Sequence, residues 1–240
     1  MPIAAAFLVA SPVHWLRCVL AEWQLVRARL VRSRLGIWLL LLGAGGAWLA
    51  ARGASLTVLA PQIAMLGAVL GIAFTVGSDA DRAALALTLT HPTTPLAVAT
   101  GRWLAAVTAA GILLLALLFV AGAQSSLPLG AMVRAAVAGF GAAAGAAGCA
   151  LLAVARGGNA LAGALLLYIA VPSIVSADAL RVAHEPDAVT RIGIAILDFL
   201  PGVWRYDALA TGDPAGWAHA AAWAAGGVVL AARLLARRAR

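Results

Sequence analysis

The chain has 240 residues, of which 64% are hydrophobic and 11% are charged. Because a soluble domain has about 25% charged residues and about 45–50% apolar ones, this composition excludes an ordinary soluble domain and indicates an integral membrane protein. The net charge of +8 comes from arginine without lysine, and in so apolar a chain it predicts contact with lipid headgroups and no binding of nucleic acid.

Residues 1–34 are predicted to form an amphipathic interfacial helix at the cytoplasmic face, with its helical pattern in residues 12–34. Apolar residues at helical spacing share one face, namely Leu16, Val19, Leu20, Trp23, Val26 and Leu30. The opposite face holds His14, Arg17, Glu22, Gln24, Arg29 and Arg32. A helix of this kind lies in the membrane plane with its basic face toward anionic headgroups. The alternative is an ordinary anchoring helix with no further role.

Residues 35–240 contain six apolar segments that are each long enough to cross a membrane. A spanning helix needs roughly 17–25 apolar residues. The segments are Leu35–Ala51, Ser55–Gly77, Trp103–Ala123, Ala135–Ala155, Ala160–Ala177 and Ala215–Ala232. The sequence therefore predicts an all-α membrane protein with six transmembrane helices.

The distribution of arginine between the connecting segments predicts the orientation. If the N-terminus lies inside, the inner segments carry twelve of the 17 arginines and the outer segments carry five. Positive residues accumulate on the cytoplasmic side of membrane proteins. Both termini are therefore predicted to be cytoplasmic.

A polar segment, residues 78–96, interrupts the apolar sequence between the second and third predicted spans. It contains "DADRAALALTLTHPTTP", in which Asp79 or Asp81 can cap a short helix and Pro92 and Pro95 end it. Such a helix presents three leucines, which need a covering protein. These are Leu85, Leu87 and Leu89, with Asp79, Asp81, Arg82 and His91 at the rim. The alternative is a solvated turn that only connects two spans.

The spans contain few polar groups, and three of them are candidates for a substrate path: Gln62, Tyr168 and Ser173. The alternative is that polar groups and prolines in these spans only shape the helix packing. In the fourth span, Gly141-xxx-Gly145 predicts close helix packing.

The predicted outer loop, residues 178–214, contains "IGIAILDFLPGVW" at Ile192–Trp204. This apolar stretch is too short to cross the membrane and includes Asp198 and Pro201. It is predicted to form a short re-entrant or interfacial helix before the last span.

The sequence contains no GxSxG, HExxH, Walker A or CxxC motif, and its four histidines lie in four different segments. The chain is therefore predicted to have no catalytic residue, metal site or cofactor of its own.

Six spans, an amphipathic entry helix and an acidic, leucine-rich, proline-terminated hairpin together resemble the permease subunit of ABC-2 type transporters. The stretch "FLPGVWRYDALATGDPAGW" and the basic tail "RLLARRAR" are also similar to that family. The resemblance implies an exporter in the bacterial cytoplasmic (inner) membrane. Its coupling helix would contain the seven hairpin residues named above and Pro92.

In such a complex, two ATPase subunits would bind ATP and magnesium, and a second permease copy, identical or related, would complete the path. The apolar walls favour a lipid, a drug-like molecule or a hydrophobic peptide as substrate. One alternative is the membrane subunit of the cytochrome c maturation heme exporter, which "RGGNAL" at Arg156–Leu161 resembles. The other is a membrane scaffold or assembly factor that transports nothing.

Overall fold

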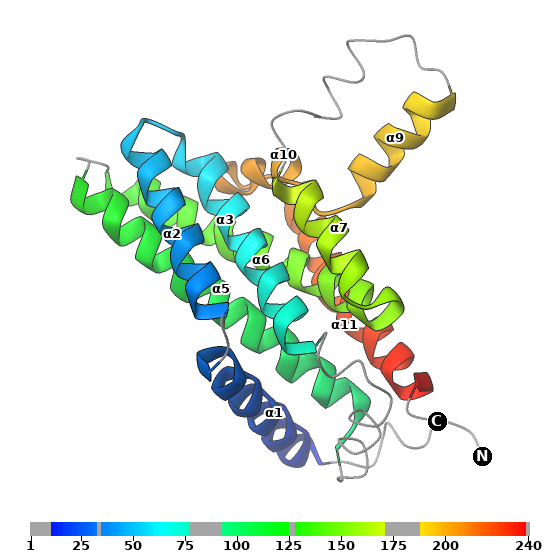
Figure 1. The fold of residues 1–240 in the computed structure, drawn as a ribbon. Helices are drawn as coiled ribbons and strands as arrows, with labels where there is room; N and C mark the ends of the chain where they lie inside the picture. Colours follow the sequence, from blue (N-terminus) through cyan, green and yellow to red (C-terminus); the bar gives the residue numbers. More distant parts are fainter. Residues whose placement is uncertain (1–10, 33–34, 77–92, 125–127, 171–187, 239–240) are drawn as a thin grey trace.

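The computed structural model describes residues 11–32, 35–76, 93–124, 128–170 and 188–238, and within these ranges the chain is helical and has no β-strand. Figure 1 shows how the helices pack. They are α1 Pro12–Arg32, α2 Leu35–Ala51, α3 Leu56–Val76, α5 Pro95–Gln124, α6 Leu129–Gly157, α7 Asn159–Ala170, α9 Ala188–Phe199, α10 Val203–Tyr206, the 3-10 helix η3 Asp207–Thr211 and α11 Pro214–Arg238.

Four of these helices, α3, α5, α6 and α11, are long and apolar enough to cross a membrane. The pair α1 and α2, which is bent by 76°, adds a fifth candidate span. The all-α prediction is therefore confirmed for the described residues, which contain four or five candidate membrane-spanning helices. Six spans stay a prediction, because the 12 described residues of α7 cover only about 18 Å and residues 171–177 lie outside the described part of the chain.

Consecutive helices of the bundle run in alternating directions (Figure 1). At the α3–α5 contact, Gly71 faces Ala106 and Gly67 faces Ala110, as two antiparallel helices require. The C-terminal ends of α3, α6 and α11 therefore lie near the start of α5, and α1 packs there too; we call this the α1 end. The starts of α3, α6 and α11 form the opposite end, the α9 end, where α9 projects from the bundle.

A small-residue surface on α6 forms the centre of the bundle. An added Cβ on Gly141 would meet the Trp217 ring, and one on Gly145 would lie 2.6 Å from the Tyr206 hydroxyl. The backbones of Gly148 and Gly227 touch directly where α6 crosses α11. The packing predicted from Gly141-xxx-Gly145 is confirmed.

Two spanning helices begin earlier than their predicted spans. The helix α5 begins at Pro95 and α6 at Leu129, whereas the spans were predicted from Trp103 and Ala135. Arg102 and Arg134 ended the apolar segments in the sequence, but an arginine does not end a helix. A threonine does start α5, because the Thr94 hydroxyl accepts a hydrogen bond from the Ala97 amide at 3.1 Å.

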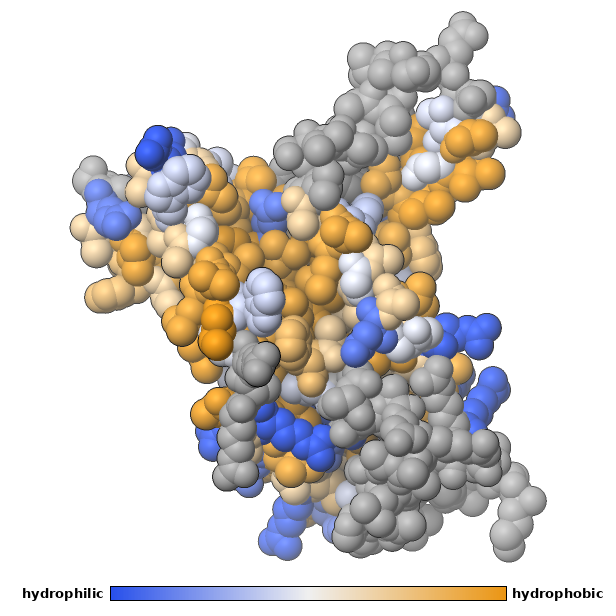
Figure 2. Space-filling view, viewed as in Figure 1, coloured by the Kyte–Doolittle hydropathy of each residue, from blue (hydrophilic) through white to orange (hydrophobic). Residues whose placement is uncertain are grey.

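The stretch Ile192–Trp204 forms two helices rather than one. The helix α9 ends at Phe199 and α10 begins at Val203. Pro201 lies between them, where its missing amide hydrogen and fixed φ interrupt the helical hydrogen bonds. Figure 2 shows the apolar surface of the bundle, with hydrophilic residues concentrated toward its ends.

Candidate functional site

A buried ion pair joins α1 to α5 at the α1 end. The Nε of Arg102 donates to Oε1 of Glu22 at 2.8 Å, and the two side chains are 1% and 9% exposed. Removing two charges from water is costly, so they remain buried only when they are well paired. The pair therefore fixes the position of α1 along α5.

Close packing extends this contact along the first half of α5. Gly101 lies directly beneath α1, because an added Cβ would be 2.9 Å from the carbonyl oxygen of Val19. One turn further along α1, the indole of Trp23 donates to the Thr108 hydroxyl at 3.3 Å. Val26 packs with Ala105 in a buried apolar cluster. The residues from Val19 to Val26 thus hold α1 against α5 over about two turns.

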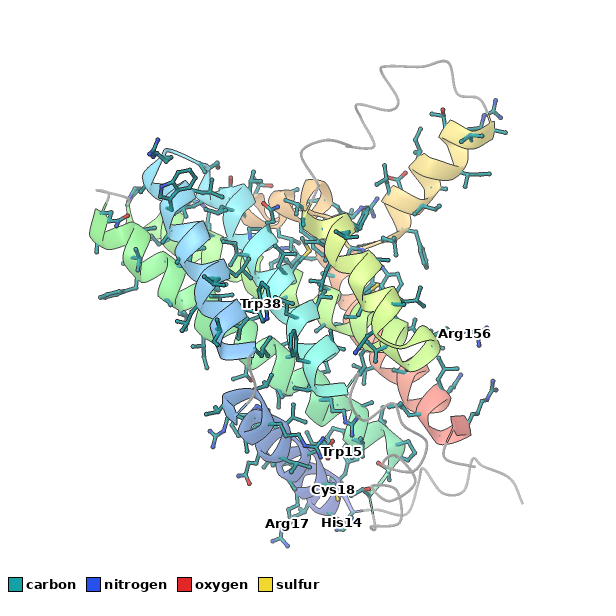
Figure 3. The ribbon with its side chains drawn as sticks, viewed as in Figure 1. His14, Trp15, Arg17, Cys18, Trp38 and Arg156 are labelled. Carbon is teal, nitrogen blue, oxygen red and sulfur yellow. The ribbon has the colours of Figure 1, made fainter. Side chains whose placement is uncertain are left out.

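The predicted polar face of α1 is wrong at Glu22, which is buried against α5. The helical pattern placed Glu22 with the arginines that face headgroups, but it is 8% exposed. The pattern sorts residues by face and does not identify their partners. Arg102 gave a usable signal, since a charge inside an apolar helix needs a partner. Figure 3 shows His14 and Arg17 near the free end of α1, and both are exposed.

The apolar face of α1 is only partly covered. Val19, Val26 and Leu30 are buried against the bundle, whereas Leu16 and Leu20 are exposed. The exposed leucines are available to lipid, as the prediction of an interfacial helix requires.

The eight predicted coupling residues lie outside the described part of the chain. They are Asp79, Asp81, Arg82, Leu85, Leu87, Leu89, His91 and Pro92. Thr93 is the first described residue after this segment, and α5 begins two residues later. The segment that contains them therefore connects directly to the helix on which α1 is clamped.

Two of the three predicted path residues lie at the contact between α3 and α7. The side-chain amide of Gln62 donates to the carbonyl oxygen of Ile169 at 3.4 Å. Tyr168, the neighbour of Ile169, is partly buried against the main apolar core. These contacts show helix packing at Gln62, and its part in a substrate path stays a prediction. Ser173 lies outside the described residues.

At the α9 end, one backbone carbonyl oxygen accepts two side-chain hydrogen bonds. The carbonyl oxygen of Phe199 accepts from Nε1 of Trp223 at 2.7 Å and from Nε2 of His219 at 2.9 Å. Because Nε2 of neutral His219 carries the hydrogen, Nδ1 is an acceptor. The Tyr206 hydroxyl lies 3.0 Å from Nδ1 and donates to it. These bonds tie α9 and α10 to the start of α11.

The Tyr206 hydroxyl is held in its protonated form. Tyr206 is fully buried, and this burial raises its pKa above the ordinary value for tyrosine, while the positive charge of Arg205 acts in the opposite direction. The hydroxyl therefore remains a donor to His219 at physiological pH. Periodicity could not predict this contact, because it joins a short helix to a span.

Within the described ranges, no three His, Cys, Asp or Glu side chains are grouped so that they could hold a metal ion. Comparison with known proteins finds no matching family model, no matching curated protein and no matching solved structure.

Proposed function

We propose that the chain is the transmembrane permease subunit of an ATP-driven ABC exporter, which forms the substrate path and couples to separate ATPase subunits. The observation that supports this most is the Glu22–Arg102 ion pair, which clamps α1 onto the first half of α5. The same helix continues directly from the predicted coupling segment. A force applied to that segment therefore reaches α5 and α1 together.

The helix α5 can carry such a displacement across the bundle. Its 30 residues extend about 45 Å, which exceeds the hydrocarbon thickness of about 30 Å. It contacts α3 through backbone-close pairs at Gly71 and Ala106. Movement at the α1 end is therefore transmitted to the α9 end through a continuous helix and its tightly packed neighbour.

The chain's own part in the cycle is to bind the ATPase and to open the path. Two ATPase subunits would bind ATP and magnesium and hydrolyse the ATP. A second permease copy would form the other half of the path. A hydrophobic anchor at the centre of an interface dominates binding, while charges at the rim contribute less. Leu85, Leu87 and Leu89 would provide that anchor.

The test compares two variants, Leu87→Asp and the control Asn159→Asp, for co-purification of the ATPase and for its stimulated hydrolysis. Asn159 is an exposed residue at the start of α7, so its replacement adds the same charge at the same end of the bundle. Burying an unpaired carboxylate at the ATPase contact costs several kcal/mol. Leu87→Asp should insert normally yet lose the co-purifying ATPase and its stimulated hydrolysis, while Asn159→Asp keeps both.

Retention of a full complement of ATPase by Leu87→Asp would overturn the coupling role of this segment. A wild-type chain that co-purifies with no ATPase from native membranes in mild detergent would favour a scaffold instead.

A further inference from the structure

Helices α6, α9 and α11 line an open apolar cavity of about 350 Å³, which begins at the α9 end and extends along α11. Leu152 of α6 and Phe199 of α9 form two of its walls. The third wall is one face of α11, on which Trp223, Gly226 and Leu230 follow one another at helical spacing. The cavity thus runs lengthwise along α11.

The polar groups of the cavity lie at one end. Asp198 and His219 line it beside Phe199, and Arg205 lies 3.5 Å from Asp198. The side chains of this ion pair are about one third exposed, at 32% for Asp198 and 28% for Arg205. The Asp198 carboxylate and His219 therefore line one end of the cavity with the Arg205 guanidinium next to the carboxylate, and the rest of the lining is apolar.

Two consecutive glycines of α11 serve different purposes here. An added Cβ on Gly227 would fall on the backbone of Gly148, so Gly227 permits the close crossing of α11 and α6. An added Cβ on Gly226 would meet no atom within 4 Å. Gly226 therefore borders open space, and a side chain there would enter the cavity without displacing a helix.

We propose that this cavity binds a phospholipid that places one acyl chain along α11 and its headgroup beside Asp198 and Arg205. The apolar length matches an alkyl chain, and the ion pair is complementary to a headgroup with both a phosphate and a primary ammonium. Arg205 binds the phosphate and Asp198 the ammonium through charge-assisted hydrogen bonds. Arg205 could still bind the phosphate of a phosphatidylglycerol headgroup, but that headgroup has no ammonium to pair with the Asp198 carboxylate. The site therefore selects phosphatidylethanolamine over phosphatidylglycerol, and this inference does not depend on a transport function.

The test measures binding of phosphatidylethanolamine to the delipidated full-length chain by native mass spectrometry. Gly226→Trp fills the cavity. Gly163→Trp is the matched control, because an added Cβ on Gly163 in α7 also meets no atom within 4 Å. Wild type and Gly163→Trp should each bind one lipid with similar affinity, and Gly226→Trp should bind at least tenfold more weakly. Ala222→Trp, at another exposed lining position, should behave as Gly226→Trp does.

The headgroup is tested by repeating the titration with phosphatidylglycerol and with Asp198→Asn. Wild type should prefer phosphatidylethanolamine, and Asp198→Asn should lose that preference. Unchanged binding to both tryptophan-filled variants would overturn the cavity as the site. Equal binding of the two lipids by wild type would overturn the assignment of Asp198 and Arg205 to the headgroup.

Discussion

Arg102 and Tyr206 are the largest fully buried side chains in the described ranges. The Arg102 guanidinium is buried between α1 and α5, where the Glu22 carboxylate supplies the opposite charge at 2.8 Å. Such a pair adds little net stability compared with apolar residues of the same size, but breaking it is expensive. Its effect is therefore to specify where α1 binds.

Replacing Glu22 with alanine should destabilise the protein by roughly 3–5 kcal/mol, because the buried guanidinium loses its carboxylate. The double variant Glu22→Met/Arg102→Met should recover most of this loss, since no unpaired charge remains. Thermal unfolding in detergent measures both. Wild-type stability in Glu22→Ala would show that the pair does not hold α1 in place.

The buried Tyr206 makes the stability of the folded protein depend on pH in the alkaline range. Because burial raises its pKa, the folded state keeps the phenolic proton that the unfolded state loses near pH 10. This contribution is present below about pH 10 and is lost as the pH rises further. The melting temperature of the wild type should therefore fall more steeply above pH 10 than that of Tyr206→Phe. Parallel curves for the two proteins would contradict this role.

At the scale of helices, the crossing of α6 and α11 depends on glycine rather than on any polar contact. Gly148 and Gly227 meet backbone to backbone, which brings the two axes close enough for the surrounding side chains to interlock. A methyl group at this crossing has to push the helices apart.

Gly148→Ala should lower stability by about 1–3 kcal/mol through overpacking. An alanine normally stabilises a helix by up to about 1 kcal/mol relative to glycine. A loss of stability in Gly148→Ala would therefore show that the two helices are too close to accept a methyl group. Gly163→Ala is the control, because its added Cβ meets no atom within 4 Å, and it should leave stability unchanged or raise it. Equal melting temperatures for the two variants in detergent would argue against the close crossing.

The length of the apolar runs predicted the existence of most helices and only part of their extent. It placed α2 at its observed bounds, because Arg34 and Arg52 coincide with its ends. It shortened α5 by eight residues, because Arg102 looked like a boundary although it lies inside the helix with a buried partner. The packing role of Gly141 was predictable from spacing alone. The contact of Tyr206 with His219 was not, because spacing within one helix says nothing about which residues of other helices it meets.

At the scale of the whole molecule, the alternating helices separate two chemically different ends. The α1 end includes the arginines of α1 and of the last turns of α6 and α11, among them Arg17, Arg156 and Arg233. The α9 end has fewer arginines in the described ranges, such as Arg52 and Arg205. This asymmetry is the physical basis for predicting which end faces the cytoplasm, since the positive-inside rule acts on charges near the ends of spans.

Cysteine labelling at the two ends of α5 tests that orientation. In a variant without Cys18 and Cys149, Thr93→Cys reports the α1 end and Gln124→Cys reports the α9 end. These positions are separated by about 45 Å of helix, so they lie on opposite sides of a hydrocarbon layer about 30 Å thick. A membrane-impermeant maleimide should label Gln124→Cys in intact cells and Thr93→Cys only after the membrane is opened, because the positive-inside rule predicts that the arginine-rich end is cytoplasmic. The reverse pattern would place both termini outside, and labelling of both positions from the same side would show that α5 does not cross the membrane.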